Sequence, residues 1–225
     1  MTTDADVVRR TNAPRSPYRR SDWYLAMRLV PGEENILSCI DDKDHDERRK
    51  KMAAAYSGKE NLTLERDLDD CILYLCRLIS SRYAIDPETE QTQGKPMDLA
   101  RKIQFLTSDI MSKVAIDAKF HDLRDDHDNF GYIDEVETMF PAMFCTSCIP
   151  RVIDFCTKIG LMSVFKPQAN ARLGFGKIHA IAREQVAKRF DAEKNVIQHK
   201  PDMLGSFLRH GLTREEAEQE SVLQL

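Results

Sequence analysis

Apolar residues recur three and four positions apart along several long stretches of the chain, which is the pattern of amphipathic helices. The longest such run lies within residues 62–83 and comprises Leu62, Leu64, Leu68, Cys71, Ile72, Leu75, Leu78 and Ile79. Residues 98–115 and 177–195 show the same spacing. Period-two alternation is scarce, so the pattern predicts an all-α fold with little or no sheet.

Polar residues indicate where the predicted helices begin. Asp41 or Asp42 is expected to cap a charged, alanine-rich helix, and Asp98 to open the next long one. Thr213 and Glu216 have the spacing of a capping box, in which each residue satisfies a backbone N–H of the other. Each signal is local, so it predicts a boundary without tertiary information.

Two domain-level expectations follow from the same pattern. Residues 1–21 carry arginines, prolines and small polar residues without periodicity, and are expected to form a flexible arm. Residues 22–225 are expected to form a single helical domain. Within it, residues 130–144 should be helical only as far as Pro141, because proline lacks a backbone N–H. The Asp- and His-rich residues 121–129 should form a solvated loop.

Composition excludes several classes of function. The 225 residues are 42% hydrophobic and carry a net charge of −4, which gives no reason to expect nucleic-acid binding. The apolar runs are far shorter than the roughly 20 residues of a membrane span. The first 20 residues are polar throughout and resemble no signal peptide. A cytoplasmic protein is therefore expected.

The six cysteines are expected to be reduced thiols, mostly in the core, because no secretory signal accompanies them. Cys145 and Cys148 have the spacing of a redox or metal pair, but no second pair and no βαβ context follows. The acidic and histidine residues at 121–129 match no known metal-binding loop. We therefore predict no metal site.

One segment resembles the C-helix of fungal microsomal cytochromes P450 of the pisatin-demethylase or benzoate-hydroxylase type. It reads DHDERRKKMAAAYS, and its His45 and Arg49 have the four-residue spacing of the two cationic residues that this family directs at a haem propionate. Other segments follow in the family's order: residues 21–36 resemble the B-helix and B–C loop, 98–115 the E-helix, 130–141 the F-helix, 175–189 the G-helix and 202–213 the H-helix. The resemblance implies a partial P450 helical domain, from the B-helix to the start of the I-helix.

Departures from the family shape the functional expectation. The chain stops at Leu225, before the family's oxygen-activating segment and haem-thiolate loop, and none of its cysteines lies in a sequence like that loop. The two glycines of the family's Thr-Phe-Gly-x-x-Phe-Gly segment are replaced by Asp117 and His121. Without a thiolate the iron lacks the ligand that drives O–O cleavage, so we expect no haem cofactor and no monooxygenase activity.

The resemblance also suggests a ligand site. Candidate ligand-binding residues are Trp23, Tyr24, Phe140, Met143, Phe144 and Phe165, the last four from the region that roofs the substrate pocket in the family. His45 and Arg49 are the candidate polar or catalytic pair. The alternatives stay open: the aromatic set belongs to the core, and the pair makes surface ion pairs.

Two functions remain as hypotheses. The first is a haem-free, P450-derived protein of fungal secondary metabolism that binds an apolar, terpenoid or polyketide-like intermediate and catalyses a cofactor-independent cyclisation or isomerisation. The second is a non-catalytic remnant that binds a partner protein or has no function. A homodimer or a partner covering the surface of the missing half is expected with either.

Overall fold

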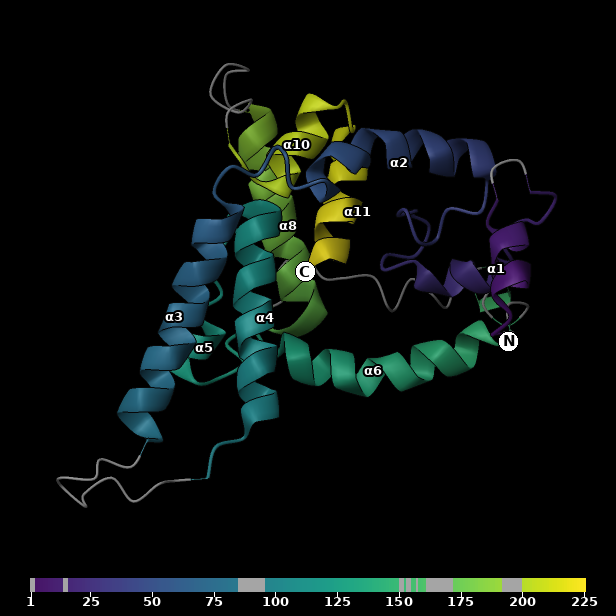
Figure 1. Ribbon diagram of the computed structural model, residues 1–225. Coiled ribbons are helices and arrows are strands. Elements are labelled where there is room, and N and C mark those ends of the chain that lie inside the picture. Colours follow the sequence, from purple (N-terminus) through teal and green to yellow (C-terminus); the bar gives the residue numbers. More distant parts are fainter. Residues whose placement is uncertain are drawn as a thin grey trace.

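The computed structural model confirms the all-α prediction: the described residues form helices and no strand. It describes residues 3–13, 16–84, 96–149, 152, 155–156, 158–160, 172–191 and 200–225. Within that part of the chain, no helix is long and apolar enough to cross a membrane. The described residues are arranged as a helical bundle from which two helices, α2 (Asp42–Tyr56) and α6 (Tyr132–Ser147), extend to one side (Figure 1).

The predicted caps are confirmed. The carboxylate of Asp41 accepts hydrogen bonds from the backbone at the start of α2 (Asp42–Tyr56), and Asp98 does so for α4 (Leu99–Ile116). Thr213 and Glu216 form both bonds of the capping box of α11 (Arg214–Gln224). Since each cap satisfies N–H groups that the helix itself leaves free, the boundaries follow from the sequence.

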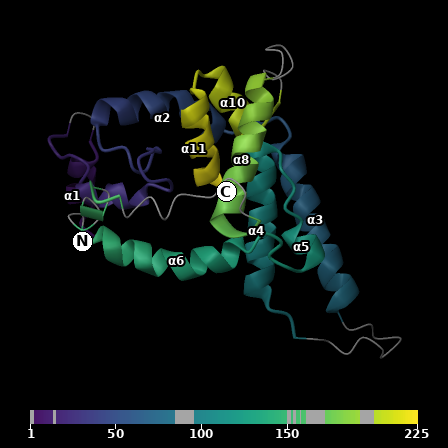
Figure 2. The same cartoon turned by 180° about the vertical axis from the view of Figure 1, so that it is seen from behind.

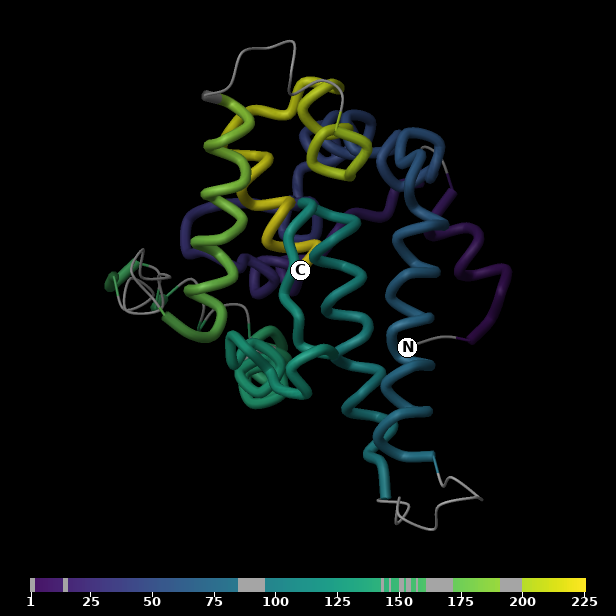
Figure 3. Tube along the Cα trace, turned by 90° about the vertical axis from the view of Figure 1, so that its left-hand side faces the viewer, coloured from purple at the N-terminus to yellow at the C-terminus, as the bar shows by residue number. Residues whose placement is uncertain are grey.

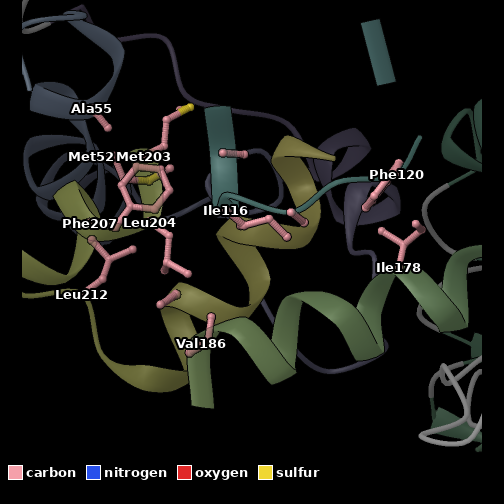
Figure 4. Close-up of a cluster of buried hydrophobic side chains, with 13 residues drawn as sticks. Met52, Ala55, Ile116, Phe120, Ile178, Val186, Met203, Leu204, Phe207 and Leu212 are labelled. Atoms are coloured by element: carbon pink, nitrogen blue, oxygen red, sulfur yellow. The ribbon is translucent and has the colours of Figure 1, made fainter. Parts of the chain in front are cut away.

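The main core joins five helices. α11 packs on α4, α8 (Gly174–Asp191) and α10 (Met203–Arg209), and α10 also packs on α4 and α2. The buried side chains of this core include Met52, Ala55, Ile116, Phe120, Ile178, Val186, Met203, Leu204, Phe207 and Leu212. Figure 4 shows Met52 and Ala55 meeting the α10 side chains at one end of the core, while Phe120 and Ile178 lie at the other.

A second, smaller core lies between α3 (Leu64–Arg82), α4 and α5 (Asp122–Asp125). Leu75 and Leu78 of α3 meet Phe105 and Leu106 of α4 there. Figure 3 shows α3 and α4 running side by side. Leu62 and Ile72, both expected on the apolar face, are instead 87% and 45% exposed. Leu62 precedes α3, so it is the exposure of Ile72 that leaves part of the α3 surface apolar.

The two extending helices are linked by the N-terminal part of the chain. The 3-10 helix η1 (Asp22–Met27) contacts α6 (Tyr132–Ser147), and α6 in turn packs on α8. Figures 1 and 2 show α2 and α6 roughly parallel, with the N-terminal segment between them. The predicted arm contains a short helix, α1 (Ala5–Thr11), with no buried residue; its mobility stays a prediction.

The proline prediction for α6 was wrong. The helix does not end at Pro141 but continues to Ser147. A proline inside a helix removes one hydrogen bond and crowds the preceding turn, which weakens a helix without always ending it. Pro141 is exposed, so water is available to the freed carbonyl.

The solvated-loop prediction for residues 121–129 was right only in part, because Arg124, Asp125 and His127 are exposed while two of the carboxylates are buried. Asp122 and Asp128 are only 1% and 6% exposed. Asp122 accepts hydrogen bonds from Asn129 N and Ser108 Oγ, and Asp128 caps α6 by accepting from three backbone N–H groups. These carboxylates stabilise the backbone of the turn, and no metal-binding cluster occurs among the described residues.

Candidate functional site

An open groove of about 480 Å³ lies along α2. His45 and Arg49, one helical turn apart, line it together with Met52, Tyr56 and the side chain of Ile36. The four-residue spacing places the two basic residues on one face of the helix. The predicted polar pair is therefore brought together beside an apolar surface.

The electrostatics of the groove favour an anionic group. Arg49 is exposed, and its guanidinium has no hydrogen bond or ion pair within the described part of the chain. Burial and the positive charge of Arg20 lower the pKa of His45, so its imidazole is neutral at pH 7. A neutral imidazole and a free guanidinium can both donate hydrogen bonds to a carboxylate.

Four of the predicted aromatic residues form one contact cluster, which we call the aromatic cluster: Trp23, Tyr24, Phe140 and Phe144. The ring of Trp23 lies 5.2 Å from that of Tyr24 and 6.0 Å from that of Phe144, and Phe140 lies 5.7 Å from Phe144. Phe140 and Phe144 are each 45% exposed. Aromatic rings left half open to solvent offer a surface to an apolar ligand.

Arg20 connects the aromatic cluster with the groove. Its guanidinium carbon lies 4.3 Å from the centre of the Tyr24 ring. The same group donates hydrogen bonds to the carbonyl oxygens of Ile36 (3.2 Å) and Leu37 (2.5 Å). Because Ile36 lines the groove, the position of its backbone is coupled to that of the aromatic cluster.

Glu220 and Arg48 form a buried contact beside the groove that was not predicted from the sequence. Glu220 of α11 is fully buried, and Arg48 of α2 donates to its Oε1 at 3.2 Å. Burial raises the pKa of Glu220 to about 7, although Arg48 opposes the shift. The helical spacing could have indicated this burial, since Glu220 lies on the same face of the helix as Ala217. An acidic residue on such a face is, however, usually expected to be exposed to solvent.

Two predicted ligand residues are not placed by the structure. Phe165 and the side chain of Met143 lie outside the described residues. The prediction of core thiols was right for Cys39, which is 2% exposed, but wrong for three others. Cys76 on α3, Cys145 on α6 and Cys148, directly after α6, are exposed; all six cysteines are free.

The described residues form a helical domain with a groove along α2, and comparison with known proteins finds its relatives among fungal cytochromes P450. Over its full length the chain is 33% identical to cytochrome P450 monooxygenase ABA1 of Pyricularia oryzae and 32% identical to cytochrome P450 monooxygenase aba1 of Botryotinia fuckeliana. It spans 43% of the length of each. These homologues are fungal cytochrome P450 monooxygenases.

A further relative is the inactive cytochrome P450 monooxygenase lolP2 of Epichloe uncinata, which is 37% identical over 65 residues, or 29% of this chain and 35% of lolP2. No family model matches the chain. No solved structure matches it. The similarity to cytochromes P450 therefore rests on relatives that match this chain along its whole length.

The described residues that line the groove provide groups that could bind the propionates at the edge of a haem, but no thiolate that could bind its iron. His45 and Arg49 supply donors of the type that hold a propionate, and the residues lining the groove include no cysteine. Cys39, the buried thiol nearest to α2 in sequence, directs its sulfur at the backbone oxygen of Asp41. The described part of the groove thus provides hydrogen-bond donors for a propionate carboxylate but no thiolate to serve as an axial ligand of the iron.

Proposed function

We propose that the chain binds an apolar small molecule carrying one anionic group, with the hydrocarbon part on the aromatic cluster and the anion at His45 and Arg49. The observation that carries this proposal is the guanidinium of Arg49, which has no partner among the described residues and lies in a groove whose other walls include Ile36 and Met52. A terpenoid or polyketide-like acid of fungal secondary metabolism has this chemistry.

The proposed chemistry requires no cofactor. A cyclisation or isomerisation moves bonds and protons within one molecule, so atoms and electrons balance without an oxidant. Holding a flexible chain in one reactive conformer lowers the entropic part of the barrier. The neutral His45 is the group that would exchange a proton, and Arg49 would stabilise negative charge that develops beside it.

Trp23 provides a direct test, because it is the only tryptophan of the chain and belongs to the aromatic cluster. We expect a C15 isoprenoid acid to change its fluorescence saturably, and the corresponding alcohol to bind more weakly. Arg49→Gln should weaken binding of the acid about three- to tenfold and leave that of the alcohol unchanged, since only the acid uses the charged donor.

The chain offers a matched control in Arg77, which is exposed on α3, away from the groove. Arg77→Gln makes the same charge change and should leave both affinities as in the wild type. Equal loss of acid binding in both variants would mean that net charge, and not the groove, is responsible.

Phe144→Ala should weaken the binding of the acid and of the alcohol to the same extent. Added haemin should produce no absorption band near 450 nm with carbon monoxide after reduction.

A second candidate function is partner binding through α6. Met139 is apolar and 48% exposed, beside the half-exposed Phe140 and Phe144. Exposed apolar surface of this kind is typical of interaction sites. Met139→Ser separates the two functions, because Met139 is not one of the four residues of the aromatic cluster. Loss of self-association in sedimentation experiments, with ligand binding unchanged, would support the second function.

A further inference from the structure

The wall of the α2 groove that Ile36 provides belongs to a compact turn. We call residues 35–38 the Ile36 turn. The Asn35 side chain accepts hydrogen bonds from the backbone of Leu37 and Ser38, each at 2.9 Å, and Ser38 Oγ accepts one from Asn35 N. These bonds make the turn a unit, so its position against the rest of the protein depends on a few outside contacts.

Glu220 makes one of those contacts from the far end of the chain. Its Oε1 accepts a hydrogen bond from the backbone N–H of Ile36 at 2.8 Å, as well as the bond from Arg48. Arg48 also donates to the carbonyl oxygen of Glu34 at 2.5 Å. Glu220 and Arg48 therefore hold the turn between α11 and α2.

The second oxygen of this carboxyl is unusual. Glu220 Oε2 is buried and has no hydrogen-bond partner within the described part of the chain. A buried carboxylate with an unpartnered oxygen is costly, whereas a protonated carboxyl places its O–H there and keeps Oε1 as an acceptor. The geometry suits the neutral form of Glu220.

The charged groups around Glu220 do not outweigh its burial. Arg48 opposes the rise of its pKa, and Glu216 adds to it. Two titratable groups on the neighbouring helices are neutral at pH 7, Tyr56 of α2 and His179 of α8. The charged groups on the neighbouring elements have other partners; they are Lys51 on α2, Glu33 and Glu34 before the turn, Lys113 and Asp117 on α4, and Arg183 on α8. Lys51 pairs with Glu216, and Arg183 with Glu218. Arg48 is thus the one cation that contacts Glu220 among the described residues.

We propose that Glu220 is a positioning residue whose protonation holds the Ile36 turn against α11 and keeps the groove in its binding shape. Its ionisation loosens the turn and weakens ligand binding. This inference rests on the proposed function, since it concerns regulation of the same site. The sign follows from linkage: a carboxyl with a raised pKa favours the folded, closed arrangement at low pH, and that preference is lost as pH rises through about 7.

Ligand binding at several pH values tests the inference. Titration of the C15 isoprenoid acid against Trp23 fluorescence should give an affinity that falls about tenfold from pH 6 to pH 8 in the wild type. Glu220→Gln should bind tightly and without pH dependence over this window. The control Glu215→Gln, exposed on the same helix, should behave as the wild type. A pH dependence retained in Glu220→Gln would overturn the inference.

A second readout does not require a ligand. The protection factor of the Ile36 amide, corrected for intrinsic exchange, should fall between pH 6 and pH 8 in the wild type and stay constant in Glu220→Gln. If the acid does not bind, the proposed function is refuted, while a fall in the protection factor of the Ile36 amide would still support the role of Glu220. A protection factor that is constant in the wild type would overturn that role even if the acid binds.

Discussion

The guanidinium of Arg189 donates two hydrogen bonds of 2.5 Å to the two carboxylate oxygens of Asp202, and both side chains are about 6% exposed. Arg189 also donates to the carbonyl oxygen of Ile116, and Asp202 accepts from the backbone of Gly205. One buried ion pair thus joins the end of α4, the last turn of α8 and the first turn of α10.

Removing one partner of this pair should be strongly destabilising. Arg189→Met leaves the Asp202 carboxylate buried without its cation, so we expect a loss of about 3–5 kcal/mol in the free energy of unfolding. Urea denaturation followed by circular dichroism measures this. Lys188→Met is the matched control, because the ion pair that the described part of the chain gives Lys188 is an exposed one with Glu184. A similar loss in both variants would contradict the structural role of the pair.

Asp128 is expected to contribute more to stability than its exposed neighbours. Its carboxylate accepts hydrogen bonds from the backbone N–H groups of Tyr132, Ile133 and Asp134 at the start of α6. Asp128→Ala should cost about 1–2 kcal/mol of unfolding free energy, the usual effect of losing an N-cap. Asp125→Ala should cost less, since its carboxylate makes exposed contacts. Thermal melts of the two variants give the comparison.

The stability of the protein should fall in acid because of His179. Burial lowers the pKa of this imidazole to about 4. The unfolded chain takes up a proton near pH 6.5 and the folded protein does not until about pH 4, so stability is lost as pH falls through this window. The loss at this residue is roughly 3 kcal/mol.

His179→Leu should remove that part of the acid dependence. Unfolding free energies at pH 7, 5.5 and 4 should fall less steeply in this variant than in the wild type. His127→Leu, which changes an exposed histidine, should keep the wild-type slope. Parallel curves for all three proteins would refute the prediction.

Thiol reactivity should follow the exposure of the cysteines. Ellman's reagent should modify Cys76, Cys145 and Cys148 of the native protein in a fast phase, because all three are exposed. Cys39 should react last, since it is 2% exposed and burial raises the pKa of its thiol. Mass spectrometry of quenched samples identifies the modified residues, and early labelling of Cys39 would show that its segment opens readily.

The features that sequence could predict are those with local causes. Asp41, Asp98 and Thr213 cap helices by bonding to residues two or three positions away, so spacing alone reveals them. The contact of Glu220 with Ile36 joins residues 184 positions apart, and no periodicity indicates it. The same holds for Arg20, whose role depends on a turn that lies 16 residues further along the chain.

The resemblance to the P450 family supplied what periodicity could not. It brought His45 and Arg49, and the four residues of the aromatic cluster, into consideration together, and the structure places each set in contact or in one groove. It was less informative for residues 121–129, where a polar composition concealed buried backbone-binding carboxylates such as Asp122.

The last prediction concerns Asp117 and His121, the two positions that are glycine in the family segment. Both adopt the left-handed backbone conformation, with φ of 54° and 64°. A residue with a side chain is strained there by about 1–2 kcal/mol, while glycine is not. Asp117 and His121 thus occupy backbone positions that favour glycine, and the turn carries strain.

Restoring glycine should stabilise the protein at one of the two positions. His121→Gly should raise the free energy of unfolding by about 0.5–1 kcal/mol, after the greater flexibility of glycine in the unfolded chain is subtracted. Asp117→Gly should gain little, because the carboxylate pairs with Lys113 and Lys200 and those pairs are lost. Lys119→Gly, at a residue without positive φ, should destabilise. Urea denaturation of the three variants measures the order, and a loss of stability in His121→Gly would show that its side chain, and not its backbone, determines this turn.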